Sequence, residues 1–146
     1  MSNNYYFIVL FALVFAVLED LKLRQVHNFY SVFIVVLKII LLIIFKTKEL
    51  LIESLLGLSV AVLIMVILFL IKKDGIGKAD IFILIALGFF LGSKLFLRAL
   101  FLISIVSLLF SIIQLARKKA KLDTEVPFFP FIFIGTAIAI VSEVIA

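Results

Sequence analysis

Two aspartates are the residues of this sequence best suited to chemistry. Asp20 lies just after one long apolar run, and Asp80 lies just before another. An ionisable group this close to hydrocarbon is costly, and it is commonly retained for a function. Two carboxyl groups that are held close together share one proton, which is what acid–base chemistry needs. The alternative is that both aspartates are ordinary acids at the ends of helices.

Two glycines precede Asp80. They are Gly75 and Gly77, separated by a single residue. Because glycine permits close backbone approach, an extended ligand backbone would lie against Gly75 and Gly77 beside the carboxylate. The alternative is a plain turn into a helix whose first-turn acid favours the helix dipole.

Two further polar or stiff segments lie on the same side of the predicted topology. Pro127 and Pro130 flank Phe128, and two prolines this close exclude helix at the entrance to the last apolar run and stiffen it. Asn28 follows the first basic segment, and we expect it to cap the turn there, with support of Asp20 as the alternative.

The composition defines the class of protein that must position these residues. Hydrophobic residues make up 66% of the 146 residues, against about 45–50% in a soluble domain. This excludes a soluble globular domain, and the 17 Phe exclude a disordered chain. The absence of Cys excludes a disulfide scaffold and a thiolate metal site, and one His leaves no histidine cluster for zinc. The sequence therefore predicts one integral membrane domain over residues 1–146.

The apolar runs predict an all-α, polytopic protein with six transmembrane helices. A spanning helix needs about 20 apolar residues, and backbone groups in lipid must be paired within the helix. The charge-free runs are Met1–Leu18, Gln25–Leu37 with its continuation Ile39–Phe45, Ser54–Ile71, Ile81–Ser93, Ala99–Ala116 and Val126–Ser142. The fourth run is short, so we expect its helix to continue to about Leu97. Lys38 interrupts the second run, and we expect it to snorkel outward.

The distribution of cations predicts the orientation. Lys and Arg total 14 against 9 acids, and nine of the cations lie in the segments 19–25, 72–80 and 117–125. Basic residues collect on the cytoplasmic side of membrane proteins. The face that carries Asp20 and Asp80 is therefore predicted to be cytoplasmic and both termini extracytoplasmic. The cytoplasmic segments account for the excess of positive charge. We therefore do not expect nucleic acid as a partner.

Three segments resemble motifs of the type IV prepilin peptidases and archaeal preflagellin peptidases. The segment from Asp20 to Asn28 is similar to an Asp, a basic stretch and Ile-Pro-Asn, with His27 where the family usually has Pro. The segment Gly77-Lys78-Ala79-Asp80 is similar to Gly-x-Gly-Asp or its Gly-x-hydrophobic-Asp variant. The segment Pro127-Phe128-Phe129-Pro130-Phe131 is similar to Pro-Phe-x-Pro-Phe.

The resemblance implies a membrane aspartic endopeptidase with Asp20 and Asp80 as catalytic residues and without metal or cofactor. The residues that it implies for positioning or substrate contact are Asn28, Gly75, Gly77, Pro127, Phe128 and Pro130. The implied partners are membrane lipid and a prepilin-like or preflagellin-like precursor. The resemblance does not define an oligomeric state. The precursor's short basic leader would be removed at the cytoplasmic face of a prokaryotic plasma membrane. Larger bacterial members carry a paired-cysteine segment that accompanies N-methylation. This chain has no Cys, so methyltransferase activity is not implied.

Two other functions remain open at this point. A small transporter or channel subunit would use Lys38 and a polar stripe on the fifth helix, formed by Ser104, Ser107, Ser111 and Gln114. We expect this stripe to form interhelical hydrogen bonds instead. A non-enzymatic assembly factor would need neither aspartate. Gly88 and Gly92 have the spacing for close helix contact, which we expect within one chain.

Overall fold

The chain folds into helices throughout the part that the computed structural model describes, which is residues 3–23, 27–73, 76–117 and 127–146. No strand occurs in these ranges, so the all-α prediction is confirmed. The elements are η1 (Asn3–Tyr5), α1 (Tyr6–Leu23), α2 (Phe29–Phe45), α3 (Lys48–Ile71), α4 (Lys78–Leu91), α5 (Ser93–Ala116) and α6 (Phe129–Ile145). Each of the six predicted runs overlaps one α-helix, although most helices extend beyond their run at one end.

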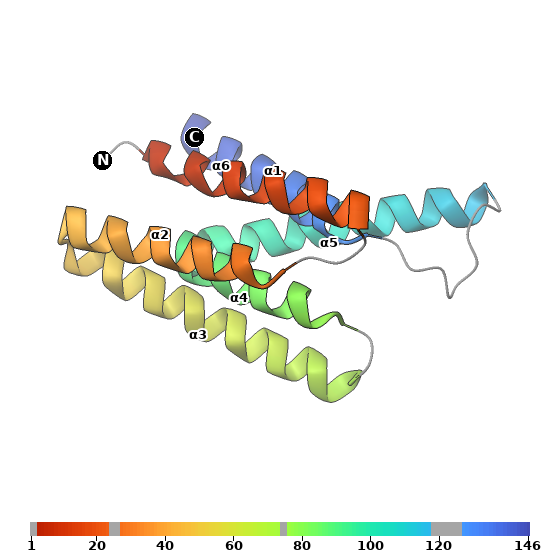
Figure 1. Ribbon diagram of the computed structural model, residues 1–146, viewed down its shortest axis with the longest axis horizontal. Helices are drawn as coiled ribbons and strands as arrows, with labels where there is room; N and C mark the ends of the chain where they lie inside the picture. The colour runs from red at the N-terminus through yellow and green to blue at the C-terminus, as the bar shows by residue number, and fades with distance from the viewer. Residues whose placement is uncertain (1–2, 24–26, 74–75, 118–126) are drawn as a thin grey trace.

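The helices run back and forth along the long axis of the molecule (Figure 1). The start of α1 and the end of α6 lie at one end. The end of α1 and the beginnings of α4 and α6 lie toward the other. The three segments that carry the predicted site residues therefore approach one another from helices that are distant in the sequence.

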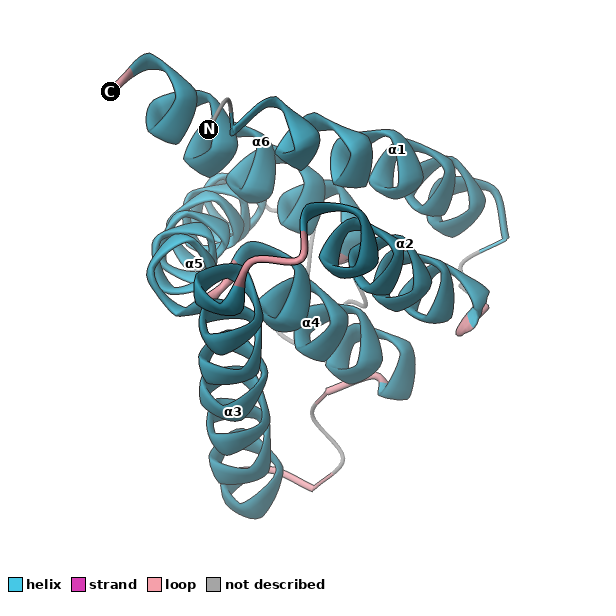
Figure 2. Cartoon of the chain, turned by 90° about the vertical axis from the view of Figure 1, so that its left-hand side faces the viewer, coloured by secondary structure: helices cyan, strands magenta, loops and turns pink. Residues whose placement is uncertain are grey.

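Helix α4 is the most enclosed element. It lies between α2 and α3 and also contacts α5, while α1 pairs with α6 on the other side (Figure 2). Half of α4 is buried, and the buried residues are Ile83, Leu84, Ala86, Leu87, Gly88, Phe90 and Leu91. Asp80 thus stands on a helix that other helices hold on several sides.

Helices α3 and α4 touch backbone to backbone. A Cβ atom on Gly57 would lie 2.1 Å from the carbonyl oxygen of Gly88, and one on Gly88 would lie 2.7 Å from the carbonyl oxygen of Gly57. Small residues permit this approach between membrane helices. The expected close contact of Gly88 is therefore made within the chain.

Helix α4 ends earlier than the sequence predicts. Gly92 adopts φ +81°, a left-handed value that residues with a Cβ rarely adopt, and α5 begins at Ser93. The expected continuation of the fourth helix to Leu97 is wrong, because this glycine turns the chain. Lys94 and Leu97 belong to α5.

The surface of the described helices is apolar and part of the interior is polar. Exposed residues include Phe11, Leu70, Ile71, Phe101 and Ile145, whereas Asp20, Ser31, Lys38, Ser54 and Thr136 are buried. A soluble protein shows the reverse distribution, so this surface suits lipid. Among the described helices, α3 and α5 are long and apolar enough to cross a membrane. Crossing by α1, α2, α4 and α6, and the orientation of the termini, stay predictions.

Candidate active site

Asp20 continues the inward-facing stripe of α1. The buried residues of this helix recur every three or four positions, as expected for the face that a helix packs on its neighbours. They are Tyr6, Val9, Ala12, Leu13, Ala16 and Asp20. The same periodicity that buries apolar side chains along α1 therefore carries the Asp20 carboxyl into the bundle, where its residue is only 8% exposed.

The start of α6 faces the Asp20 carboxylate. The backbone N–H of Phe129 donates to Oδ2 of Asp20, with an N···O distance of 3.4 Å. The first N–H groups of a helix have no partner inside the helix, and the positive end of its dipole lies there. Pro130, in the first turn, has no N–H to offer. Burial raises the pKa of Asp20, and the Phe129 hydrogen bond opposes part of that rise.

Asp80 lies in the first turn of α4, three residues after Gly77, which is the N-terminal cap residue of that helix. The Asp80 carboxyl folds back toward this glycine, because a Cβ atom on Gly77 would lie 3.0 Å from Oδ2 of Asp80. The missing side chain thus lets the Asp80 carboxylate lie close to the backbone of Gly77. The positive end of the α4 dipole also favours a negative charge there.

The two aspartates are close enough to influence each other electrostatically. Both lie outside the charge-free apolar runs, Asp20 near the end of α1 and Asp80 near the start of α4. Burial raises the pKa of Asp80, and the negative charge of Asp20 raises it further, to about 6. A second negative charge nearby disfavours ionisation, so Asp80 keeps its proton to a higher pH than a free aspartate does.

Of the remaining predicted site residues, some lie near Asp20 and others do not. Pro127 and Phe128 are partly buried and lead into α6, with Phe128 as its cap residue, so this segment reaches Asp20 through Phe129. Asn28 precedes α2 but is exposed and makes no side-chain cap hydrogen bond, so the expected cap is wrong. Gly75 lies outside the described residues.

The backbone N–H of Phe129, which donates to Asp20, is not among the groups predicted for the site. The signal was present, because a helix that begins beside a proline exposes unpaired N–H groups at its start. What the sequence lacked was any indication of which acid those groups face. The two partners are separated by 109 positions.

His27 joins the α1–α2 connection to the end of α1. Its Nδ1 atom contacts a carboxylate oxygen of Glu19, and the Tyr30 hydroxyl hydrogen-bonds the same carboxylate. The bond from Tyr30, followed by the one from His27, lowers the pKa of Glu19. The residue that stands where the resembling family has proline therefore fixes this connection by a side-chain contact. Glu19 is occupied by these partners.

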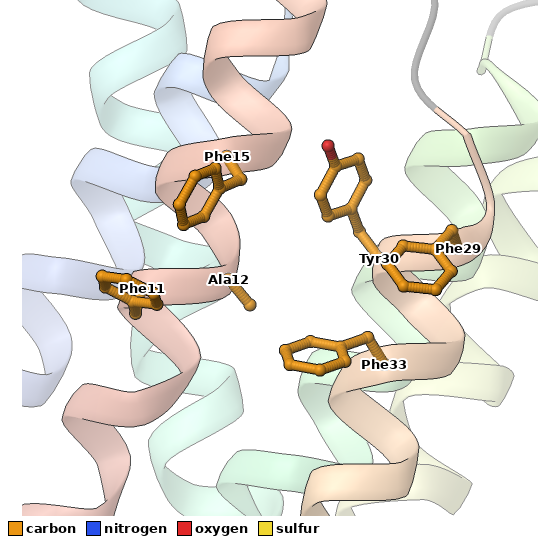
Figure 3. A pocket seen from close by; sticks show the side chains of 6 residues that line it. All are labelled: Phe11, Ala12, Phe15, Phe29, Tyr30 and Phe33. Carbon is orange, nitrogen blue, oxygen red and sulfur yellow. The ribbon is translucent and has the colours of Figure 1, made fainter.

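An apolar groove of about 280 Å³ lies between α1 and α2. Figure 3 shows Tyr30 and Phe33 of α2 pointing toward α1. Its lining consists of Phe11, Ala12, Phe15, Phe29, Tyr30 and Phe33. No carboxyl group is among these residues, so the groove itself offers no acidic group for acid–base chemistry.

Two expectations about the residues that a transporter would use are wrong. Lys38 does not snorkel outward, because its ammonium is buried and donates to the carbonyl oxygen of Phe90 over 2.7 Å. In the part of the chain that the structure describes, the three serines of the α5 stripe form no hydrogen bond to another helix. Ser104 and Ser111 donate to carbonyls one turn earlier in their own helix and are exposed. Within the described residues, the stripe therefore lines no interior path.

Two carboxyl groups from separate helices, one with a pKa raised toward neutrality, form the kind of site that an acid–base hydrolase uses. The chain belongs to the type IV leader peptidase family, whose model matches residues 7–112. This family is membrane-associated and consists of aspartic-type peptidases. The matched range contains Asp20, Asn28, Gly77 and Asp80 and ends before Pro127. Searches among curated proteins and among solved structures gave no match.

Proposed function

We propose that the protein is an aspartic endopeptidase that removes the short basic leader from a prepilin-like or preflagellin-like precursor at the cytoplasmic face of a prokaryotic plasma membrane. The observation that carries the proposal is the electrostatic coupling of Asp20 with Asp80, which come from α1 and α4. Membership of the leader peptidase family supports the substrate class. The excess of cations on the face of the aspartates supports the cytoplasmic orientation.

The surroundings of the two aspartates suggest a different role for each. Asp20 accepts the Phe129 N–H at the positive end of α6, which stabilises its charge. We therefore assign it as the base that takes a proton from water. Asp80, with a pKa near 6, holds the shared proton and donates it to the scissile carbonyl oxygen. The water oxygen bonds to the carbonyl carbon, the C–N bond then breaks, and the leaving amine takes a proton from the pair.

The segments around the pair would position the substrate. Gly77 has no side chain that would obstruct an extended peptide backbone approaching Asp80. The stiff segment of Pro127, Phe128 and Pro130 would hold the start of α6 so that its first N–H faces Asp20. The basic leader would remain in the cytoplasm while the apolar segment of the precursor lies in the membrane.

Co-expression with a candidate precursor tests the proposal. The precursor should have a short basic leader, a small residue before the cut and an apolar segment of about 20 residues. The unmodified chain should shorten it. Asp20→Asn and Asp80→Asn, which keep the shape but remove the ionisable group, should each slow cleavage by at least about 10²-fold.

Glu19→Gln is the matched control, because it removes the neighbouring carboxylate of the same helix and should leave cleavage intact. Normal cleavage by Asp20→Asn would refute the proposed pair. A precursor left uncut by every form, together with transport that depends on Lys38, would favour a transporter. Function that survives loss of both aspartates would favour an assembly factor.

A further inference from the structure

Lys38 is the largest fully buried side chain of the described residues, with only 1% of its surface exposed. It lies on the same inward stripe of α2 as Ser31 and Ile34. Taking an ammonium group out of water is costly, and a methionine of similar length would fill the space without that cost. The cost of burying the Lys38 ammonium therefore indicates a role that requires its charge or its hydrogen-bond donors.

The Lys38 ammonium is held by groups from several elements. It donates to the carbonyl oxygen of Phe90 in α4 over 2.7 Å. The centres of the Tyr5 and Phe90 rings lie 5.4 Å and 5.3 Å from Nζ, within the range of cation–π attraction. Glu53 of α3 is the acid whose charge acts on it, and it does so from beyond ion-pair distance. Lys38 therefore ties α2 to η1 and α4.

The Phe90 carbonyl lies in the last turn of α4, where carbonyl oxygens have no partner inside the helix. The negative end of the helix dipole lies there as well, and a cation is favourable at that point. Asp80 occupies the other end of the same helix, about 15 Å away along its axis. One short helix thus carries an ammonium group at its end and a carboxyl group at its beginning.

From this geometry we infer that Lys38 is a positioning residue for the aspartate pair. Its ammonium fixes the last turn of α4 to α2 and η1, and so sets how far Asp80, at the other end of this rigid helix, reaches toward Asp20. The backbone contact between Gly57 and Gly88 fixes the C-terminal part of α4 against α3. The Lys38 contact fixes the last turn of α4 against α2 and η1 as well. For the activity measurement below, the inference rests on the proposed peptidase function.

A cross-linking experiment tests the inference without any enzymatic activity. The chain contains no Cys, so the variant with Asp20→Cys and Asp80→Cys offers one thiol pair to a short bifunctional reagent. We expect Lys38→Met in this background to lower the cross-linked fraction several-fold, and Lys38→Arg, which keeps charge and donor, to restore it. Lys94→Met, at an exposed lysine of α5, is the control that should leave the fraction unchanged.

Kinetics of the unmodified aspartate pair supply the second readout. A displacement of about 1 Å in a catalytic group costs about 10²-fold in rate. We expect Lys38→Met to lower kcat by that order with little change in KM and to bring the two limbs of the pH–rate profile closer together, because separated carboxyls couple less. A purely structural role would reduce the amount of folded protein without moving the profile.

An unchanged cross-linked fraction or an unchanged pH profile would each overturn the inference. If Lys38→Met does not yield folded protein in detergent, Lys38→Gln keeps a donor for the Phe90 carbonyl without the charge. The same two measurements then decide, with a smaller displacement expected. If the unmodified chain cleaves no precursor, the proposed function fails, whereas the cross-linked fraction still decides the role of Lys38.

Discussion

The backbone N–H of Phe129 and the carboxylate of Asp20 form a hydrogen bond over 3.4 Å that joins the first turn of α6 to the last turns of α1. Asp80 lies at the first turn of α4, so each aspartate stands at the positive end of a helix dipole. The two differ in their neighbours. Asp20 receives a donor, whereas Asp80 receives the repulsion of Asp20. This difference leads to three predictions, and the packing of α3 on α4 leads to a fourth.

Cleavage should decline as the pH rises through about 6. The Asp80 carboxyl has its pKa raised to about 6 by burial and by the charge of Asp20. Below that pH the pair keeps its proton, and above it both carboxyls ionise, so the general acid is lost. Initial cleavage rates across a pH series should show an alkaline limb with a midpoint near 6. A rate that stays constant from mildly acidic to alkaline pH would contradict the assignment of Asp80 as the proton holder.

Asp20→Asn should lower the pKa of Asp80. The charge of Asp20 is one of two causes that raise this pKa, and the amide of Asn removes it while burial remains. The value should fall below that of the unmodified chain and stay above that of a free aspartate. Infrared spectroscopy of isotope-labelled aspartate follows the carboxyl directly. Glu19→Gln, the control, removes a more exposed acid of α1 and should leave the pKa of Asp80 unchanged. Identical titration curves for the unmodified chain, Asp20→Asn and Glu19→Gln would show that the two aspartates are not coupled.

Asp80→Asn should change how stability depends on pH. The pKa of Asp80 is raised on folding, so the folded state binds its proton more tightly than the unfolded state. The stability from this group is fully present below the ordinary pKa of aspartate, and it is lost as the pH rises through about 6. Thermal unfolding in detergent should show the unmodified chain losing stability across that window and the variant losing less. Parallel curves for the two proteins would argue against a raised pKa.

Gly57→Ala should destabilise the packing of α3 on α4. The added Cβ would lie 2.1 Å from the Gly88 carbonyl oxygen, and a backbone atom has no rotamer by which to move aside. We expect a loss of about 1–3 kcal/mol in unfolding free energy, the usual cost of overpacking. Denaturant titration in detergent measures it. Ser59→Ala, at an exposed position of the same helix, should cost far less, and equal losses for the two variants would mean that the close approach is not rigid.

The sequence predicts the helices and the aspartate pair because both follow from local patterns. Charge-free runs mark the helices, and the alternation of cation-rich segments brings Asp20 and Asp80 to one end. The features that it predicts wrongly depend on contacts between distant residues or on single backbone angles. Lys38 finds its acceptor 52 positions away in Phe90, and a lone lysine in an apolar run does not reveal such a partner.

Local chemistry also overrides simple patterns at two other places. The fourth helix stops because Gly92 takes φ +81°, which its apolar flanks do not indicate. The hydroxyl groups of Ser104 and Ser111 bond to carbonyls of their own helix, so their helical spacing marks no interhelical contact.

The shortness of α4 has a consequence for the lipid around it. Its 14 residues rise about 21 Å, whereas the hydrocarbon of a typical bilayer is about 30 Å thick. A helix that carries a carboxyl at one end and meets an ammonium at the other gains nothing by sinking either end into acyl chains. In a bilayer we expect this hydrophobic mismatch to be met by local thinning and by water entering beside Asp80. Lipids with shorter acyl chains would then suit the protein better than longer ones.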